Sequence, residues 1–254
     1  MNDLPDEMTE DAFLGGKLRL RQPKSGHRAG HDAILLAAAT AARPGDRVVD
    51  LGAGVGAAGL AVARRVAAIK LVLVEIDEAL AGLARGNAAS NAIPADIVVL
   101  DVASGAEAFA AVGLSPDTVD VVLMNPPFND SVRHPASPDK RREIAHIAGA
   151  TTLESWVHAA RRMLKSGGAL TMIWRADAVA QVLAALDRGF GSLAILPVHA
   201  DATSPASRVL VRAVKGGRTP VRIQPALILN EASRPGQKVR DILDGEGILP
   251  LATL

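Results

Sequence analysis

The sequence predicts an α/β fold with a doubly wound, mostly parallel sheet of about seven strands that includes an antiparallel terminal strand. Three observations lead to this prediction. Apolar segments rich in Val, Ile and Leu recur between residues 47 and 174, as expected for parallel strands that are buried on both faces. Segments of helical length separate them. Further apolar segments then follow with short connections, which favours antiparallel pairing.

The expected elements follow one another along the chain. A half-exposed strand over 17–22 precedes a helix over 32–42, which Pro44 and Gly45 end. The alternation then predicts strands at 47–51, 71–75, 97–100, 119–124 and 169–174. The helices between them are expected at 57–66, 78–90, 104–112 and 153–164. A helix over 176–188, strands at 192–199, 208–214 and 221–229, and a short helix around 239–243 complete the fold.

Length and composition predict one domain over residues 14–254, preceded by a flexible tail over 1–13. The chain has no cysteine, which excludes disulfides and thiolate metal sites, and we expect no metal. No apolar run reaches membrane-spanning length, and the acidic N-terminal segment lacks the apolar stretch of a secretory signal. A cytoplasmic protein is therefore expected.

A glycine-rich segment follows the first buried strand and precedes a helix. It reads Val-Asp-Leu-Gly-Ala-Gly-Val-Gly over 49–56, and its glycines are Gly52, Gly54 and Gly56. Glycines here let the backbone turn sharply into the helix and approach a ligand closely. The same segment also fits a dinucleotide-binding GxGxxA pattern through Gly52, Gly54 and Ala57, so the loop alone leaves the ligand open.

Three acids lie at the ends of the first three buried strands. They are Asp50, Glu75 and Asp101, and ligands of doubly wound sheets bind at this edge. Glu75 can accept hydrogen bonds from two ribose hydroxyls, and Asp101 can accept one from an adenine amino group. Asp50 is placed either to hold the loop or to meet a cationic group of the ligand. Strand-end acids also cap the helices that follow, so that bland alternative stays open.

The fourth buried strand ends in the motif Asn125-Pro126-Pro127-Phe128. Two prolines after a strand force a rigid, extended loop. The side-chain carbonyl of Asn125 and the main-chain carbonyl of Pro126 can accept the two hydrogens of a planar amino group, and Phe128 offers a surface on which a base can stack. The motif predicts catalytic positions for methylation of an sp2-hybridised nitrogen, a reaction that depends on in-line positioning.

Taken together and in this order, these motifs resemble class I S-adenosylmethionine-dependent methyltransferases that act on amino groups. The resemblance runs from about Leu18 to Leu229. It implies a Rossmann-like fold and S-adenosyl-L-methionine as the cofactor. It also implies a set of cofactor contacts, namely Asp50, Gly52, Gly54, Gly56, Glu75, Ile76, Asp101, Val102 and Asn125.

A narrower resemblance is to the bacterial tRNA(Val) adenine-N6 methyltransferases. It rests on residues 18–22, on residues 29–36, which read Ala-Gly-His-Asp-Ala-Ile-Leu-Leu, and on residues 207–211. It implies adenine N6 of a tRNA as the methyl acceptor, and it makes Gly30 and Asp32 candidate neighbours of the cofactor. Two departures put the substrate in doubt: His31 and Ala33 stand where that family has Thr and Gly, and Phe128 stands where it usually has Tyr.

Basic clusters are the candidate contacts to an RNA substrate. Residues 12–31 and 202–230 contain no acid, and a third cluster lies in the long loop after the motif. Phosphates would be held by Lys17, Arg19, Arg21, Lys140, Arg141 and Arg142. The alternative is that these charges are only a solvated face. His134 and His146 flank the third cluster, and a general-base role is the less favoured interpretation because this reaction needs little base assistance.

Other functions remain open at this stage. Asn-Pro-Pro-Phe also occurs in guanine-N2 rRNA methyltransferases, and Asn-Pro-Pro-Tyr occurs in protein-glutamine N5-methyltransferases of release factors. A dinucleotide-dependent oxidoreductase is a remote alternative, because the Asn125 motif has no role in hydride transfer. A non-catalytic binding module is also remote, because the intact Asn125 and Phe128 argue against lost activity.

Overall fold

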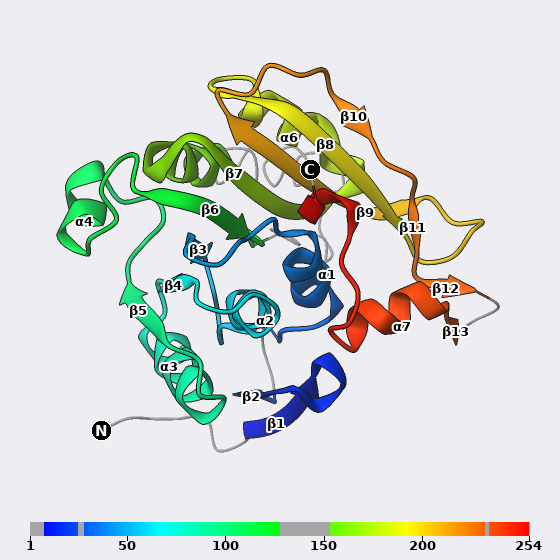
Figure 1. Cartoon of the computed structure of the whole chain (residues 1–254), viewed down its shortest axis with the longest axis horizontal. Coiled ribbons are helices and arrows are strands. Elements are labelled where there is room, and N and C mark those ends of the chain that lie inside the picture. Colours follow the sequence, from blue (N-terminus) through cyan, green and yellow to red (C-terminus); the bar gives the residue numbers. More distant parts are fainter. Residues whose placement is uncertain (1–7, 25–27, 128–152, 232–233, 254) are drawn as a thin grey trace, which may run out of the picture.

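The computed structural model describes residues 8–24, 28–127, 153–231 and 234–253 (Figure 1). Its central sheet has nine strands in these residues, in the order β10-β8-β9-β7-β6-β3-β4-β5, and β11 also pairs with β8. The bounds of the longer strands are β3 (Arg47–Leu51), β4 (Lys70–Glu75), β5 (Ala95–Val99), β6 (Val119–Met124), β7 (Leu164–Arg175), β8 (Phe190–His199) and β9 (Ala206–Lys215).

Strands β3 to β7 run parallel to one another, whereas β9 lies antiparallel between β7 and β8. The fold class predicted from the sequence is confirmed, with the antiparallel strand inserted inside the sheet. The parallel strands therefore bring the residues after β3, β4, β5 and β6 to one edge of the sheet.

Helices cover both faces of the sheet and bury one apolar cluster on each side. One face is covered by α1 (His31–Ala39), α2 (Ala57–Arg65), α3 (Glu78–Ser90) and α7 (Gln237–Leu243). The other face is covered by α4 (Ala106–Ala111), a helix over 153–163 and α6 (Val179–Leu186), which the 3-10 turn η3 (Ala176–Ala178) precedes. Burial on both faces explains why the central strands are continuously apolar.

Local chemistry sets several boundaries. Asp77 begins α3 because its carboxylate accepts from the backbone N–H groups of Ala79 and Leu80, at 2.8 and 3.0 Å. The strand expected over 221–229 is instead two short strands parallel to β8, namely β10 (Arg222–Ile223) and β11 (Leu227–Ile228). Pro225 lies between them and has no N–H to donate to a continuous ladder.

An N-terminal hairpin corrects the expectation of a tail. β1 (Met8–Phe13) pairs antiparallel with β2 (Leu18–Pro23), so residues 8–13 are a strand and not part of a flexible tail. The hairpin is held by the buried side chains of Leu18 and Leu20, which alternate along β2 with exposed arginines. Residues 1–7 lie outside the described part of the chain.

Two asparagines, Asn87 of α3 and Asn91 at its C-cap, attach this hairpin to the sheet domain. Asn91 accepts from the backbone N–H of Arg19 at 2.9 Å and donates to its carbonyl at 2.6 Å. Asn87 does the same with Arg21, at 2.8 and 3.0 Å, and also donates to the carbonyl of Val55 at 3.0 Å. These amide side chains act as a strand partner for β2 and connect it to the glycine-rich segment.

The remaining elements are small. The 3-10 turns η1 (Leu14–Gly16) and η4 (Pro250–Thr253) and the hairpin of β12 (Asn230–Glu231) with β13 (Arg234–Pro235) lie around α7 and the sheet edge. Among the helices of the described residues, none combines the length and apolar character needed to cross a membrane.

Candidate functional site

The glycine-rich segment forms the turn from β3 into α2. Gly52, Gly54 and Gly56 adopt φ values of +69°, +57° and +88°, which residues other than glycine rarely adopt. The backbone N–H groups of Gly52 and Ala53 donate to the carbonyl of Val74 at 2.8 and 2.9 Å, so the turn is fixed to β4. The structure thus gives these glycines the conformational role that the sequence predicts.

Glu75, the last residue of β4, holds this turn. One carboxylate oxygen accepts from the N–H of Gly54 at 2.7 Å, and the other accepts from the N–H groups of Ile76 and Asp77 at 2.9 and 3.0 Å. The residue is 7% exposed. A carboxylate oxygen that accepts one hydrogen bond retains a second lone pair, so Glu75 can still accept from a ribose hydroxyl.

Asp50 lies beneath the same turn. It is 2% exposed, and its carboxylate accepts from the N–H of Gly59 in α2 at 2.8 Å. Burial raises the pKa of Asp50 to about 7; the bond from Gly59 opposes the rise and the nearby charge of Glu75 adds to it. Of its two predicted roles, the described contacts favour holding the loop and α2.

The residues that follow β4 and β5 at this edge of the sheet form a polar and an apolar surface. Asp101 is exposed, and one carboxylate oxygen accepts from the N–H of Ala103 at 2.8 Å while the other makes no described bond. Ile76 is 62% exposed, whereas Val102 is buried. An exposed apolar side chain between two acids fits a flat base such as adenine, and these residues fit the nucleoside part of S-adenosylmethionine.

Asn125 stands next to the glycine turn, because β6 neighbours β3 in the sheet. Its side-chain oxygen is fully buried and has no hydrogen-bond partner in the described structure. Pro126 is buried and Pro127 is exposed. A buried, unpaired amide oxygen is unfavourable unless a donor is supplied, so this atom is a candidate acceptor for a donor group of a ligand. Phe128 lies outside the described residues, as do His134, His146 and the cluster at 140–142.

Trp156 is a site residue that the sequence analysis missed. It lies on the helix over 153–163, and a Cβ placed on Gly52 would overlap its ring. The indole therefore covers the first glycine of the turn. Its signal in the sequence is weak: Trp156 is one of two tryptophans in an aromatic-poor chain, in the helix that follows the Asn125 loop.

Gly30 and Asp32 lie at the start of α1. Gly30 precedes the helix as its N-cap residue, and Asp32 pairs with Arg208 of β9 at 3.0 Å. Arg208 stands opposite Arg175, the last residue of β7, so the pair lies at the same edge as the glycine turn. The ion pair fixes α1 to this edge, and the described contacts add no cofactor role to it.

The basic residues of the hairpin are paired with acids. Lys17 binds Glu246 at 3.1 Å, and Arg19 and Arg21 lie 3.2 and 3.7 Å from Glu10 of β1. These pairs weaken the positive potential that the sequence predicts for this segment. The segment over 12–31 contains no acid of its own because the acids that pair with its basic residues lie in β1 and near the end of the chain.

The order of the site along the edge is that of the strands: Asn125 after β6, the glycine turn after β3, Glu75 at the end of β4 and Asp101 after β5. This sheet order, with one antiparallel strand among parallel ones and a glycine turn after its first parallel strand, defines a class I methyltransferase fold.

Comparison with known proteins identifies the family. Residues 29–200 match the methyltransferase small domain family, and the chain belongs to that family.

Individual relatives extend the comparison. The tRNA1(Val) (adenine(37)-N6)-methyltransferase of Bacteroides thetaiotaomicron is 32% identical over 63% of this chain and 64% of its own length. The release factor glutamine methyltransferase of Bifidobacterium longum is 35% identical over 49% of this chain and 46% of its own. A crystal structure from Agrobacterium tumefaciens, described as a predicted O-methyltransferase, is 32% identical with a TM-score of 0.72, covering 86% of this chain and 98% of its own. The chain thus spans just under two thirds of the Bacteroides relative.

Proposed function

We propose that this protein transfers a methyl group from S-adenosyl-L-methionine to an exocyclic amino nitrogen, and that the acceptor is adenine N6 of a tRNA. The observation that carries the proposal is the buried, unpaired side-chain oxygen of Asn125 beside the glycine turn. A donor N–H is what this atom lacks, and an exocyclic amino group supplies two.

The chemistry follows from the acceptor's electronic structure. The lone pair of an exocyclic amine is delocalised into the ring, so the nitrogen is a poor nucleophile. When its hydrogens bond to Asn125 Oδ1 and to the carbonyl of Pro126, the nitrogen is favoured to leave the ring plane and direct its lone pair at the methyl group. S-adenosylmethionine supplies an activated methyl on a positive sulfur, so positioning matters more than a strong base.

The opposite side of the site supports the cofactor. Glu75 retains acceptor capacity for a ribose hydroxyl, Asp101 has an unbonded carboxylate oxygen, and Ile76 offers an apolar surface. Val102, Gly52, Gly54 and Gly56 complete the proposed cofactor contacts, with Asp50 holding the turn from below. Gly30, Asp32 and Asn125 stay proposed neighbours of the cofactor at this edge.

The proposed RNA substrate is supported by the Bacteroides relative, whose name assigns it to adenine 37 of a tRNA. The target base would leave its stack, place its amino group at Asn125 and stack on Phe128. We propose phosphate contacts from Lys140, Arg141 and Arg142, with smaller contributions from the ion-paired Lys17, Arg19 and Arg21. A tRNA substrate would place the reaction in the cytoplasm.

The experiment that tests the proposal identifies the methylated nucleoside. Purified protein and methyl-labelled S-adenosylmethionine are incubated with RNA from cells that lack the gene, with Asn125→Ala as the control. The RNA is then digested and separated. Label in N6-methyladenosine of the tRNA fraction, absent with the variant, supports the proposal. Label in a methylguanosine of rRNA keeps the mechanism and overturns the substrate.

A second candidate is a protein-glutamine N5-methyltransferase. The relative from Bifidobacterium longum favours it, and the side-chain amide of glutamine is also a planar nitrogen with two hydrogens. The same assay with a protein fraction separates the two candidates. Label in protein, with none in RNA, supports the glutamine acceptor and overturns the tRNA acceptor.

A further inference from the structure

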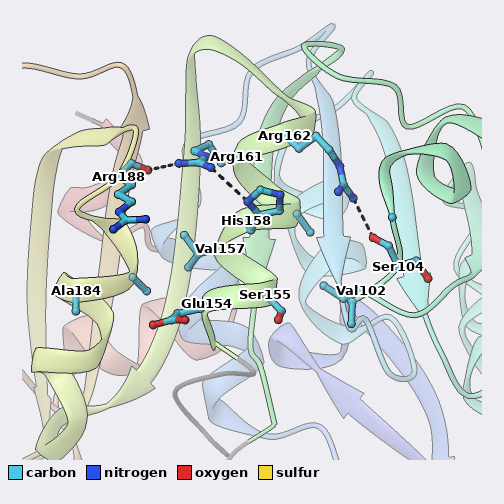
Figure 2. A pocket seen from close by; sticks show the side chains of 14 residues that line it. Val102, Ser104, Glu154, Ser155, Val157, His158, Arg161, Arg162, Ala184 and Arg188 are labelled. Carbon is cyan, nitrogen blue, oxygen red and sulfur yellow. Dashed lines mark hydrogen bonds between the residues drawn. The ribbon is translucent and has the colours of Figure 1, made fainter. Parts of the chain in front are cut away.

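A hollow of about 670 Å³ lies on the face of the molecule that α4 and α6 cover (Figure 2). Its floor is the helix over 153–163, and its walls are residues 102–105 and the end of α6 near Ala184 and Arg188. Val102, a proposed cofactor contact, lines one end. The hollow therefore begins beside the proposed cofactor site and extends along the helix whose Trp156 covers Gly52.

The hollow is positively charged. Arg161, Arg162 and Arg188 line it together with His158, and Glu154 is its one acid among the lining residues. Figure 2 shows Arg188 across the hollow from Val102, and Arg162 on the same side as Val102 with its bond to Ser104. Positive charge therefore lines both sides of the hollow.

Two of these arginines have described hydrogen-bond partners other than carboxylates. Arg161 donates to the carbonyl of Arg188 at 2.8 Å and lies 3.3 Å from the ring nitrogen Nδ1 of His158. Arg162 donates to the carbonyl of Ser104 at 3.2 Å and lies over the ring of Phe109, 4.8 Å from its centroid. In the described parts of the chain, none of the three arginines forms an ion pair with a carboxylate.

The hairpin makes an informative contrast. There, Lys17, Arg19 and Arg21 each have an acid within 4 Å, so an RNA phosphate would have to compete with a carboxylate for them. In the hollow, carbonyl and ring-nitrogen partners hold the guanidinium groups of Arg161 and Arg162 in place, whereas Arg188 is exposed, and no described carboxylate compensates the charge of any of the three. A preoriented, uncompensated guanidinium is the better phosphate ligand.

We propose that this hollow binds the phosphate backbone of the RNA substrate, with Arg161 and Arg188 as phosphate ligands. The inference rests on the proposed function and adds the path of the RNA to it. The backbone would run from the acceptor site along the helix over 153–163, and Arg162 would steady the wall formed by Ser104. The reacting base and the bound phosphates would then be connected through one rigid helix.

The test is RNA binding as a function of salt. The double variant Arg161→Glu/Arg188→Glu is expected to weaken tRNA binding by the full-length protein about tenfold or more near 100 mM salt. It should make the slope of log K against log salt less negative by about two, because two phosphate contacts are lost. The Kd for S-adenosylmethionine, measured by calorimetry, should stay unchanged.

A matched control is the double variant Arg85→Glu/Lys238→Glu. Both residues are exposed and neither has a described ion pair, and they lie on α3 and α7, which cover the face of the sheet opposite the hollow. This variant changes the net charge equally but leaves the hollow intact, so it should weaken RNA binding far less. Equal weakening by the two double variants would overturn the proposal, since the effect would then be one of overall charge.

A milder variant guards against misfolding, because the side chain of Arg161 packs against Gly189. Arg188→Gln removes one charge, and its expected effect is a slope less negative by about one with unchanged thermal unfolding. If the wild-type protein binds and methylates tRNA and this variant keeps the wild-type slope, the hollow is not the phosphate site, although the proposed function stands. If the wild-type protein binds no RNA, both are overturned.

Discussion

On the proposed cofactor side of the site, the polar groups are hydrogen-bonded within the protein: the buried carboxylate of Asp50 accepts from Gly59, and that of Glu75 accepts from three backbone N–H groups. On the proposed acceptor side, the side-chain oxygen of Asn125 is buried and has no described partner. The two sides adjoin in the sheet, where β3 pairs with β6.

The difference indicates that some groups of the site contribute to the stability of the fold and others to the rate of methyl transfer. Groups that are paired within the protein preorganise the turn, so their loss is expected to lower the free energy of unfolding and to weaken cofactor binding together. A group without a partner in the protein forms its hydrogen bond only when the substrate amine is bound. Its loss should therefore lower the rate of methyl transfer and leave the free energy of unfolding unchanged.

The largest expected effect is that of Asn125→Ala. Removing one preorganised acceptor should reduce kcat by about 100- to 1,000-fold, by analogy with the loss of one transition-state hydrogen bond. The free energy of unfolding should stay the same or rise slightly, because an unpaired buried oxygen is removed.

Single-turnover kinetics and urea unfolding measure the two quantities. Asn125→Asp is the matched control, since it keeps an acceptor oxygen at this position and should retain more activity than the alanine variant. If the alanine variant loses stability and keeps its rate, the division between the two sides is wrong.

The next effect is that of Gly52→Ala. The new methyl group would overlap the ring of Trp156, and φ is +69°, so a loss of about 1–3 kcal/mol in the free energy of unfolding is expected. Gly54→Ala is the control, because its φ is +57° but its Cβ would meet open space.

A double variant separates the two causes. Adding Trp156→Ala to Gly52→Ala should recover the part of the loss that comes from the overlap and leave the part that comes from φ. Equal losses in Gly52→Ala and Gly54→Ala would show that Trp156 does not constrain the turn.

A pH-dependent effect of comparable size is expected from Asp50→Asn. In the folded protein Asp50 keeps its proton up to about pH 7, whereas in the unfolded chain it loses the proton near pH 4. Between these values the folded state binds one proton more, so this contribution to stability is complete below pH 4 and is lost as the pH rises toward 7.

Asparagine keeps an oxygen to accept from Gly59 and does not titrate. The stability of the variant relative to wild type should therefore rise with pH by an amount on the order of 3 kcal/mol between pH 4 and 7. Denaturant unfolding at several pH values measures it. A difference that is constant over this range would contradict the raised pKa.

The smallest effect should come from Arg19→Gln/Arg21→Gln in the hairpin. Both charges are exposed and paired with Glu10, and such surface pairs contribute little. RNA affinity is expected to change by less than about threefold, against tenfold or more for the reversal of Arg161 and Arg188. A larger loss of affinity in a filter-binding assay would indicate that the hairpin arginines contact the RNA.

The sequence predicts those parts of the site whose positions depend on residues close to one another along the chain. The bounds of β3 and β6 were predicted correctly because five or six consecutive apolar-rich residues define them, and the acids at strand ends follow from the same register. The positions of Glu75 and Asn125 at the edge follow from this register, but their bonding does not.

Contacts between segments that lie far apart along the chain could not be predicted from the sequence. Trp156 covers a glycine about a hundred residues earlier in the chain. Glu10 pairs with arginines across a hairpin whose first strand lies in the segment predicted to be a tail. The single strand expected over 221–229 is wrong because Pro225, which cannot donate to a ladder, interrupts it.

The position of β9 has a consequence for synthesis of the protein. The ribosome makes β8 before β9, yet β9 lies between β7 and β8, so β8 cannot join the sheet until β9 has emerged. A nascent chain stalled before Ala206 would present the open edge of β7 and an unpaired apolar β8, the kind of surface that templates aggregation. Translation speed through residues 190–215 is therefore expected to govern the yield of native enzyme, and chaperones that shield strand edges should bind the chain in that interval.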